Sequence, residues 1–71
     1  MAETHDTLGD ALPREMARVR DQVLPAYLAV SGGAIAATMM RHSLDRAAQA
    51  LAEGDVVAMM RAYQDLKGYT L

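Results

Sequence analysis

A break of only two residues between two long helical stretches constrains this chain more than any other feature of its sequence. Residues 34–53 contain almost no helix breakers, and a second amphipathic stretch follows at 56–67. Between them, Gly54 supplies the left-handed backbone conformation that ends a helix, and Asp55 caps the free N–H groups of the next helix. A connection this short forces the two helices to lie side by side and antiparallel. The sequence therefore predicts a helical hairpin that turns at Gly54.

A further helix precedes the hairpin, and its prolines predict where it starts and bends. It should begin between Asp10 and Pro13, because aspartate caps a helix and proline is tolerated in a first turn. An interior proline costs roughly 3 kcal/mol and kinks a helix, so Pro25 predicts either a bend near residues 21–25 or two short helices. Apolar residues keep helical spacing on both sides of this proline, which favours the bend. These residues are Met16, Val19, Val23, Tyr27 and Val30. Ser31-Gly32-Gly33 supplies left-handed positions that end the helix.

The composition also favours helices over strands. Trp and Phe are absent, and the hydrophobic residues are mostly Ala, Leu, Val and six Met. Alanine and methionine are good helix formers and poor strand formers. Residues 1–9 show no periodicity and are predicted to form a flexible arm. The predicted fold is therefore all-α, with a kinked N-terminal helix packed across the C-terminal hairpin in a single domain at 10–71.

The length of the chain predicts that it needs support from another molecule. A chain of 71 residues buries only about 60% of the surface that its unfolded form exposes. Cysteine is absent, which removes disulfides and thiolate metal sites as a source of stability. Small domains without such links are stabilised by oligomerisation or by a partner. We therefore expect a homo-oligomer.

Charge and hydropathy bear on the partners and the location. The formal net charge is −2, so the chain has no strong basic field to attract nucleic acid or anionic lipid. The polar, acidic opening at residues 1–6 differs from a secretory signal. The longest apolar run, 23–40, is divided by Gly32 and Gly33, so it does not form one membrane-spanning helix. These features predict a cytoplasmic protein, with nucleic acid and membranes not expected as partners.

The helical faces divide the apolar residues into a core and a surplus. The predicted core face of the middle helix comprises Ala36, Met40, Ser43, Leu44, Ala47 and Leu51. The predicted core face of the last helix comprises Val56, Met59, Met60, Tyr63 and Leu66. Outside these faces, the middle helix has a second apolar strip of Ile35, Met39 and Ala50, and the first helix has one of Ala17, Leu24 and Leu28. A three-helix monomer cannot cover all of this surface.

The surplus apolar surface predicts an interface with a second copy or another protein. Arg20 projects from the apolar arc of the first helix, where it either snorkels to water, pairs with an acid across an interface, or acts as a contact hot spot. The predicted interface residues are Arg20, Leu24, Tyr27, Leu28, Ile35 and Met39.

Arginines suggest a second kind of site, because guanidinium groups bind phosphates and other anions bidentately. The candidate anion-binding residues are Arg14, Arg18, Arg20 and Arg41. Arg14 and Arg18 lie four residues apart on the polar side of the first helix, where solvated charges are normal. An alternative function is therefore a module that binds a small anionic ligand, such as a nucleotide, between protomers near Arg20, Tyr27 and Arg41.

The sequence contains three further patterns that bear on a catalytic or binding function. His42 lies near Asp45, but no second ligand or nucleophile has a suitable spacing, so an exposed histidine is the better interpretation. The glycines at 32 and 33 lack the Lys-Ser or Lys-Thr of a phosphate-binding loop and serve as a helix stop. The hairpin also permits a helix-turn-helix DNA-binding regulator as an alternative. Its base-reading residues would be Arg61, Gln64 and Lys67, with Asp65 among them.

Two resemblances accompany these patterns. The segment 50–55, followed by Ala58, Ala62, Tyr63 and Leu66, resembles half of a tetratricopeptide repeat. Such a solenoid needs at least three repeats, which this chain cannot hold. Through the stretch 16–20 and the Gly54 hairpin, the whole chain resembles small uncharacterised helical proteins encoded in prophages of GC-rich bacteria. That resemblance implies a phage-encoded modulator or inhibitor of a host system.

These observations favour a non-enzymatic interaction protein that binds itself and a partner macromolecule. Catalysis needs a nucleophile, a base and oxyanion donors that converge in a concave pocket, and the sequence supplies no such set. No catalytic, cofactor-binding or metal-ligating residue is predicted, and no cofactor is expected.

Overall fold

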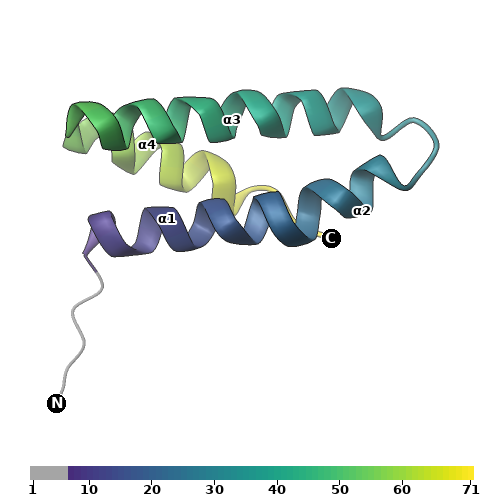
Figure 1. Ribbon diagram of the computed structural model, residues 1–71, viewed down its shortest axis with the longest axis horizontal. Coiled ribbons are helices and arrows are strands. Elements are labelled where there is room, and N and C mark those ends of the chain that lie inside the picture. The colour runs from purple at the N-terminus through teal and green to yellow at the C-terminus, as the bar shows by residue number, and fades with distance from the viewer. Residues whose placement is uncertain (1–6) are drawn as a thin grey trace, which may run out of the picture.

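The computed structural model describes residues 7–71, and the three predicted helices are all present in this range (Figure 1). The first is a continuous bent helix made of α1 (Leu8–Arg18), the π-helical turn η1 (Val19–Val23) and α2 (Leu24–Leu28). The other two are α3 (Ala34–Glu53) and α4 (Val56–Lys67). Residues 7–71 contain no strand. The prediction of an all-α fold is confirmed.

The first helix begins at Leu8, earlier than predicted. Thr7, and not Asp10, is the N-cap: its Oγ1 accepts a hydrogen bond from the backbone N–H of Asp10 at 3.3 Å and donates one to the Asp10 carboxylate at 2.9 Å. The predicted start between Asp10 and Pro13 is therefore wrong, because threonine caps a helix as aspartate does and stands one turn earlier. Of the predicted flexible arm, Leu8 and Gly9 are helical, and residues 1–6 lie outside the described residues.

The bend before Pro25 is confirmed, and a π turn produces it. The backbone stays helical through Val23 and Leu24, so the helix is not split in two. The N–H of Leu24 donates to the carbonyl of Val19, five residues back, in place of the usual four. Proline has no N–H, and its ring collides with the carbonyl four residues earlier in a regular helix. The widened turn directly before Pro25 accommodates this collision, as π bulges at helix bends do.

The connection from α2 to α3 depends on two glycines with different roles. Gly32 has a φ of +82°, the left-handed conformation that the sequence predicts. Gly33 has a φ of −80°, which any residue adopts, but it is buried against the end of α2. A Cβ atom on Gly33 would lie 1.8 Å from the carbonyl oxygen of Tyr27. The left-handed prediction is thus confirmed for Gly32 alone, and Gly33 is required for close packing.

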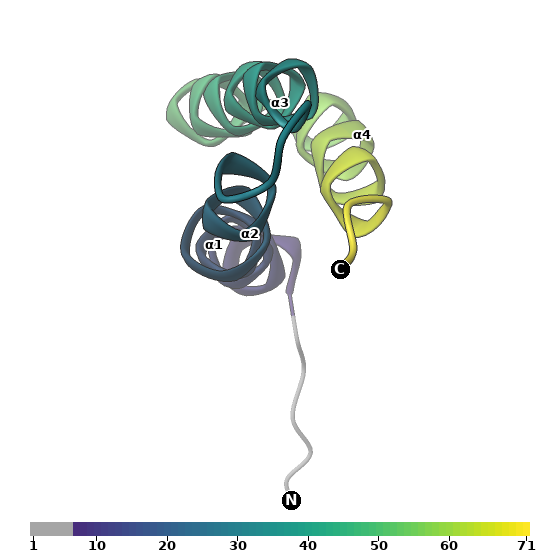
Figure 2. The same ribbon diagram turned by 90° about the vertical axis from the view of Figure 1, so that its right-hand side faces the viewer.

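The bounds of α3 and α4, the stop at Gly54 and the cap at Asp55 agree with the prediction. Gly54 ends α3 with a φ of +67°, and the Asp55 carboxylate accepts a hydrogen bond from the N–H of Ala58 at 3.2 Å. The bent first helix packs along this hairpin: α1 contacts α4 and α3, and α2 contacts the beginning of α3. Viewed end on, the three helices occupy the corners of a triangle (Figure 2).

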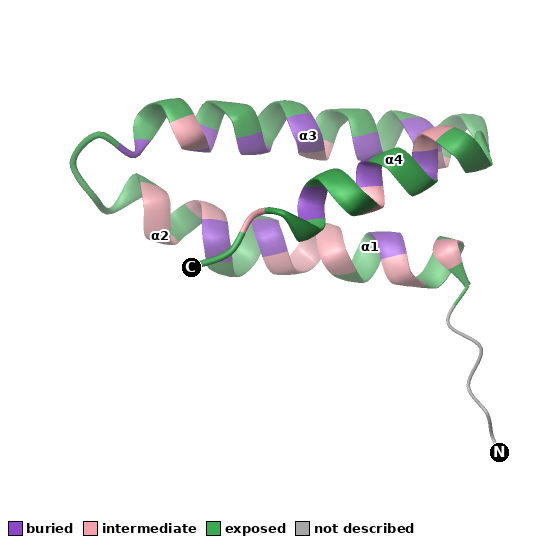
Figure 3. Ribbon diagram, turned by 180° about the vertical axis from the view of Figure 1, so that it is seen from behind, coloured by how far each residue is buried: buried purple, intermediate pink, exposed green. Residues whose placement is uncertain are grey.

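The core lies along the inner faces of this triangle (Figure 3). Its buried hydrophobic residues are Leu12, Val19, Val23, Met40, Ala47, Ala50, Met59, Ala62 and Leu66. The predicted face is wrong for Val56 and Met60, which are 61% and 50% exposed, and Ala50, assigned to the outer strip, is 3% exposed. From hydropathy alone, the bulkiest residues of α4 are expected to face the core. In the structure, alanines of the hairpin face the neighbouring helix, so the two helices approach closely and Val56 and Met60 point outward.

Candidate interaction surface

The largest exposed hydrophobic side chains of α3 lie on a part of the helix that α4 does not reach. At 1.5 Å per residue, the 20 residues of α3 span about 30 Å and the 12 residues of α4 about 18 Å. Because α4 starts beside the C-terminal end of α3, the N-terminal turns of α3 extend past it (Figure 3). Ile35 and Met39 lie in these turns and are 78% and 55% exposed.

Helical spacing places Ile35 and Met39 on the same side of α3 as residues that border α4. Arg46 and Glu53, which follow at positions seven and fourteen after Met39, line the groove between α3 and α4. The uncovered apolar residues therefore lie on the same side of α3 as the exposed residues that line the groove further along.

The end of α2 adds to this surface. Leu28 is 49% exposed, and Val30, in the connection to α3, is 58% exposed. Beside Val30 lies a shallow hollow of about 220 Å³, lined by Ala26, Tyr27, Val30 and Leu71. We use the name apolar end for four of the exposed hydrophobic residues in this part of the molecule, which are Leu28, Val30, Ile35 and Met39. Single exposed hydrophobic residues are ordinary, whereas larger exposed apolar patches mark interaction sites.

The structure separates the six predicted interface residues into three groups. Leu28, Ile35 and Met39 belong to the apolar end. Leu24 and Tyr27 are partly buried against the core, and the Tyr27 hydroxyl donates a hydrogen bond to the Thr70 carbonyl at 3.2 Å. Arg20 is exposed and lies beside Asp21.

Arg20 is exposed and pairs with Asp21 of its own chain, whereas the sequence left open contact with water, with an acid across an interface, or with a partner as a hot spot. Its guanidinium donates to both carboxylate oxygens of Asp21, at 2.8 and 2.9 Å. This hydrogen bonding, with the attraction of the two charges, raises the pKa of Arg20, and the hydrogen bond from Arg20 lowers the pKa of Asp21. Arg20 lies inside the π turn, where the angle between successive residues differs from that of a regular α-helix.

Arg18, a candidate anion-binding residue, binds groups of its own chain. It is partly buried, and its Nη2 donates to the Glu15 carboxylate at 2.7 Å and to the backbone carbonyls of Leu66 and Tyr69 at 3.1 and 2.9 Å. A cation is favourable at this position, because the C-terminal end of α4 presents free carbonyls and a partial negative charge. The residues after α4 are also held through Tyr69, whose hydroxyl lies 2.9 Å from Ser43 Oγ. Arg18 thus anchors the C-terminal end of α4.

The four candidate arginines are not gathered into one anion site. The donors of Arg18 face the end of α4, and those of Arg20 face Asp21. Arg14 is exposed on α1 and engaged in an interaction of its own, and Arg41 is exposed on α3. The predicted base-reading residues of α4 also diverge: Arg61 lines the groove with α3, whereas the Lys67 ammonium lies 5.4 Å from the centre of the Tyr63 ring.

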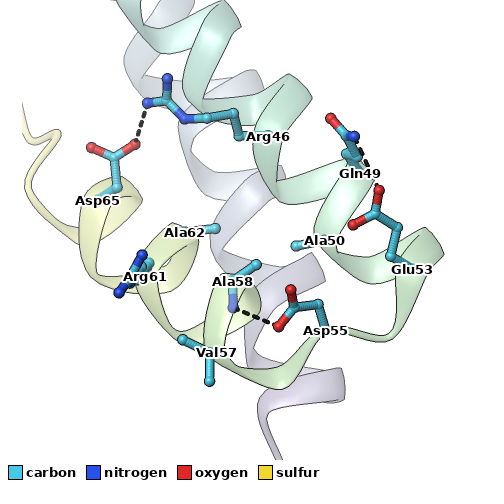
Figure 4. A pocket seen from close by; sticks show the side chains of 10 residues that line it. All are labelled: Arg46, Gln49, Ala50, Glu53, Asp55, Val57, Ala58, Arg61, Ala62 and Asp65. Carbon is cyan, nitrogen blue, oxygen red and sulfur yellow. Dashed lines mark hydrogen bonds and ion pairs between the residues drawn. The ribbon is translucent and has the colours of Figure 1, made fainter.

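A groove of about 450 Å³ runs between α3 and α4, and sequence reasoning missed it (Figure 4). Its lining residues are Arg46, Gln49, Ala50, Glu53, Asp55, Val57, Ala58, Arg61, Ala62 and Asp65. At one point Arg46 on α3 bridges to Asp65 on α4 at 3.3 Å, and the Gln49 amide donates to Glu53 at 3.1 Å. The signal in the sequence is the placing of alanines at 50, 58 and 62, on either side of the Gly54 turn.

Two further properties concern the described part of the chain. Residues 7–71 contain no group of three or more His, Asp or Glu side chains arranged to hold a metal ion. Within the same residues, no helix has the length and apolar character needed to cross a membrane.

The chain was also compared with known proteins. No family model, no curated protein and no solved structure matches it.

Proposed function

We propose that this chain is a non-enzymatic interaction protein that associates with itself and binds another protein through the apolar end. The observation that carries the proposal is the exposure of Ile35 and Met39 on turns of α3 that lie beyond α4. Removing apolar surface from water contributes about 25 cal/mol per Å², and a Leu, Ile or Met side chain contributes roughly 1.5–3 kcal/mol when it becomes fully buried. Covering these side chains is therefore a substantial driving force for association.

A second copy of the chain suits this surface. Most homo-oligomers are symmetric, so that the same patch on two subunits packs against itself. Two apolar ends related by a two-fold axis bring α3 against α3, so that each Ile35 and Met39 covers its counterpart. The charge of Arg20 is already balanced by Asp21 within one chain, so it adds no unpaired charge to such an interface. We also propose a partner protein, and the resemblance to prophage-encoded proteins predicts that it is a host protein.

The test is the mass of the protein in solution. Size-exclusion chromatography with light scattering at micromolar concentration should give a mass above that of the monomer, 7.7 kDa. Replacing Ile35 and Met39 together by serine should return the protein to the monomer. Replacing Val56 and Met60 together by serine is the matched control, because these residues are 61% and 50% exposed but lie in α4 and do not line the groove. A wild-type protein that is strictly monomeric contradicts the proposal.

A further inference from the structure

We propose that the groove between α3 and α4 is a docking site for an amphipathic helix of a partner protein. That helix presents small apolar residues to the groove, a lysine or arginine at the end near the Gly54 turn, and a carboxylate opposite Arg61. This site is distinct from the apolar end, so it adds a second surface to the proposed function.

The shape of the groove suits a helix. Its floor is formed by Ala50, Ala58 and Ala62, whose short side chains leave space between two antiparallel helices. Figure 4 shows α1 behind the hairpin, so the groove opens away from the first helix. Packed helices lie 8–10 Å apart, and small residues at the contact permit the closest approach. A helix in this groove would therefore complete a second three-helix arrangement on the outer side of the hairpin.

The charges along the groove define the chemistry of the partner. Glu53 and Asp55 stand at the turn, and the bridge from Arg46 to Asp65 lies further along the two helices. Arg61 lies between these points. It follows Asp55 by six residues, which corresponds to about 9 Å along α4. The Arg61 guanidinium makes no hydrogen bond or ion pair with any described residue. A complementary helix thus needs a basic residue at the turn and an acidic residue one to two turns away.

These same features disfavour other occupants. Carboxylates outnumber arginines in the lining by three to two, which opposes a nucleic acid backbone or another polyanion. Small-molecule sites combine an enclosed apolar cavity with convergent polar groups. Here the floor is three methyl groups, two of the charged side chains are bonded to each other, and the groove is open along its length (Figure 4). The open floor of small residues and the charge pattern together match a helix.

The experiment is a selection for helices that bind the intact protein. A phage-displayed library of alanine-rich helices about 18 residues long, long enough to be stable alone, carries Lys, Glu or Ala at random on one face. Enriched peptides should carry a basic residue and, seven positions away on the same helix face, an acidic one. Arg61→Glu should weaken their binding about fivefold, since removing one partly exposed ion pair costs up to about 1 kcal/mol. Exchanging the acidic residue of the peptide for lysine should restore binding to Arg61→Glu.

Arg41→Glu is the matched control, because it makes the same charge change on an exposed arginine of α3 that does not line the groove. It should leave peptide affinity unchanged. The proposal is overturned if the library gives no binder, or if Arg61→Glu and Arg41→Glu bind the selected peptides equally. Peptide affinity should also be retained when Ile35 and Met39 are replaced by serine, so the outcome is independent of the oligomeric state that tests the apolar end.

Discussion

The turn at Gly54 and the turn at Gly32-Gly33 both use glycine to join helices, yet they need it for different reasons. A side chain added at Gly54 would meet no atom within 4 Å, so this position requires only the left-handed backbone. Gly33 has an ordinary φ, but a Cβ atom there would lie 1.8 Å from the Tyr27 carbonyl oxygen. Glycine provides conformational freedom at the first turn and space at the second.

The two turns differ in whether neighbouring residues or distant packing determine them. The Gly54 turn is determined by neighbouring residues: a left-handed stop followed by the Asp55 cap. The turn at Gly33 is determined by the return of α3 against the end of α2, which depends on the bend at the π turn. Local conformation can be predicted from spacing and residue type, whereas the close approach of two segments requires their packing to be known.

The strongest test of this contrast is Gly33→Ala. The added methyl group would overlap the backbone of α2, which cannot move without displacing α3, so we expect a loss of about 3 kcal/mol in the free energy of unfolding. Urea denaturation followed by far-ultraviolet circular dichroism, at one fixed protein concentration, measures it. Gly32→Ala, one residue away, is the control and should lose only about 1 kcal/mol, because it meets no atom within 4 Å. Equal losses for the two variants would remove the distinction between conformation and space.

The two ends of α4 differ in the same way as the two turns, because a neighbouring residue holds one end and a distant residue holds the other. Asp55 caps its beginning from the adjacent position, whereas Arg18, from the first helix, binds carbonyls at its end. Arg18→Met keeps much of the side-chain volume but removes these bonds and leaves the partly buried Glu15 without its partner. We expect a loss of about 2 kcal/mol, together with faster amide hydrogen exchange in the last turn of α4. Arg41→Met, on an exposed arginine, should change neither quantity.

The sequence therefore predicts most of the fold. The bounds of α3 and α4, the bend before Pro25 and the hairpin follow from turn residues, caps and helical spacing, which act within a few residues. The start of the first helix was placed too late, because Thr7 and Asp10 are both good caps and the pattern does not rank them.

The candidate site is predicted less well. Ile35 and Met39 were recognised as surplus apolar surface, because their spacing separates them from the core face. For Arg18 and Arg20 the structure shows contacts that helical spacing does not predict, since one binds carbonyls 48 and 51 residues away and the other bonds Asp21 within a π turn. The groove was missed because alanines give no hydropathy contrast, and only the packing of α3 on α4 shows that they form its floor.

Gly54→Ala tests the locally determined turn alone. We expect a loss of about 1 kcal/mol in the free energy of unfolding, the cost of a left-handed conformation for a residue with a Cβ atom. Gly54→Asn should lose less, since asparagine tolerates this conformation. The measurement is again urea denaturation at fixed protein concentration. A loss for Gly54→Ala as large as that for Gly33→Ala would mean that the hairpin turn is also restricted by packing.

The smallest expected effect is at Arg20 and Asp21, where a bond between adjacent residues lies on the surface of the π turn. The hydrogen bond from Arg20 lowers the pKa of Asp21 in the folded chain. A carboxyl group with a lowered folded pKa stabilises the fold above its unfolded pKa, and this contribution is lost as the pH falls through the folded value. Arg20→Ala should return the pKa of Asp21 toward its ordinary value, measured by NMR titration of the carboxyl carbon, and should remove that part of the acid dependence of stability. Because both side chains are exposed and adjacent, helix content at neutral pH should not change. A loss of helix content at neutral pH would instead show that the pair of Arg20 and Asp21 supports the π turn. The pair would then resemble Gly33, whose role is in packing, more than Gly54, whose role is local.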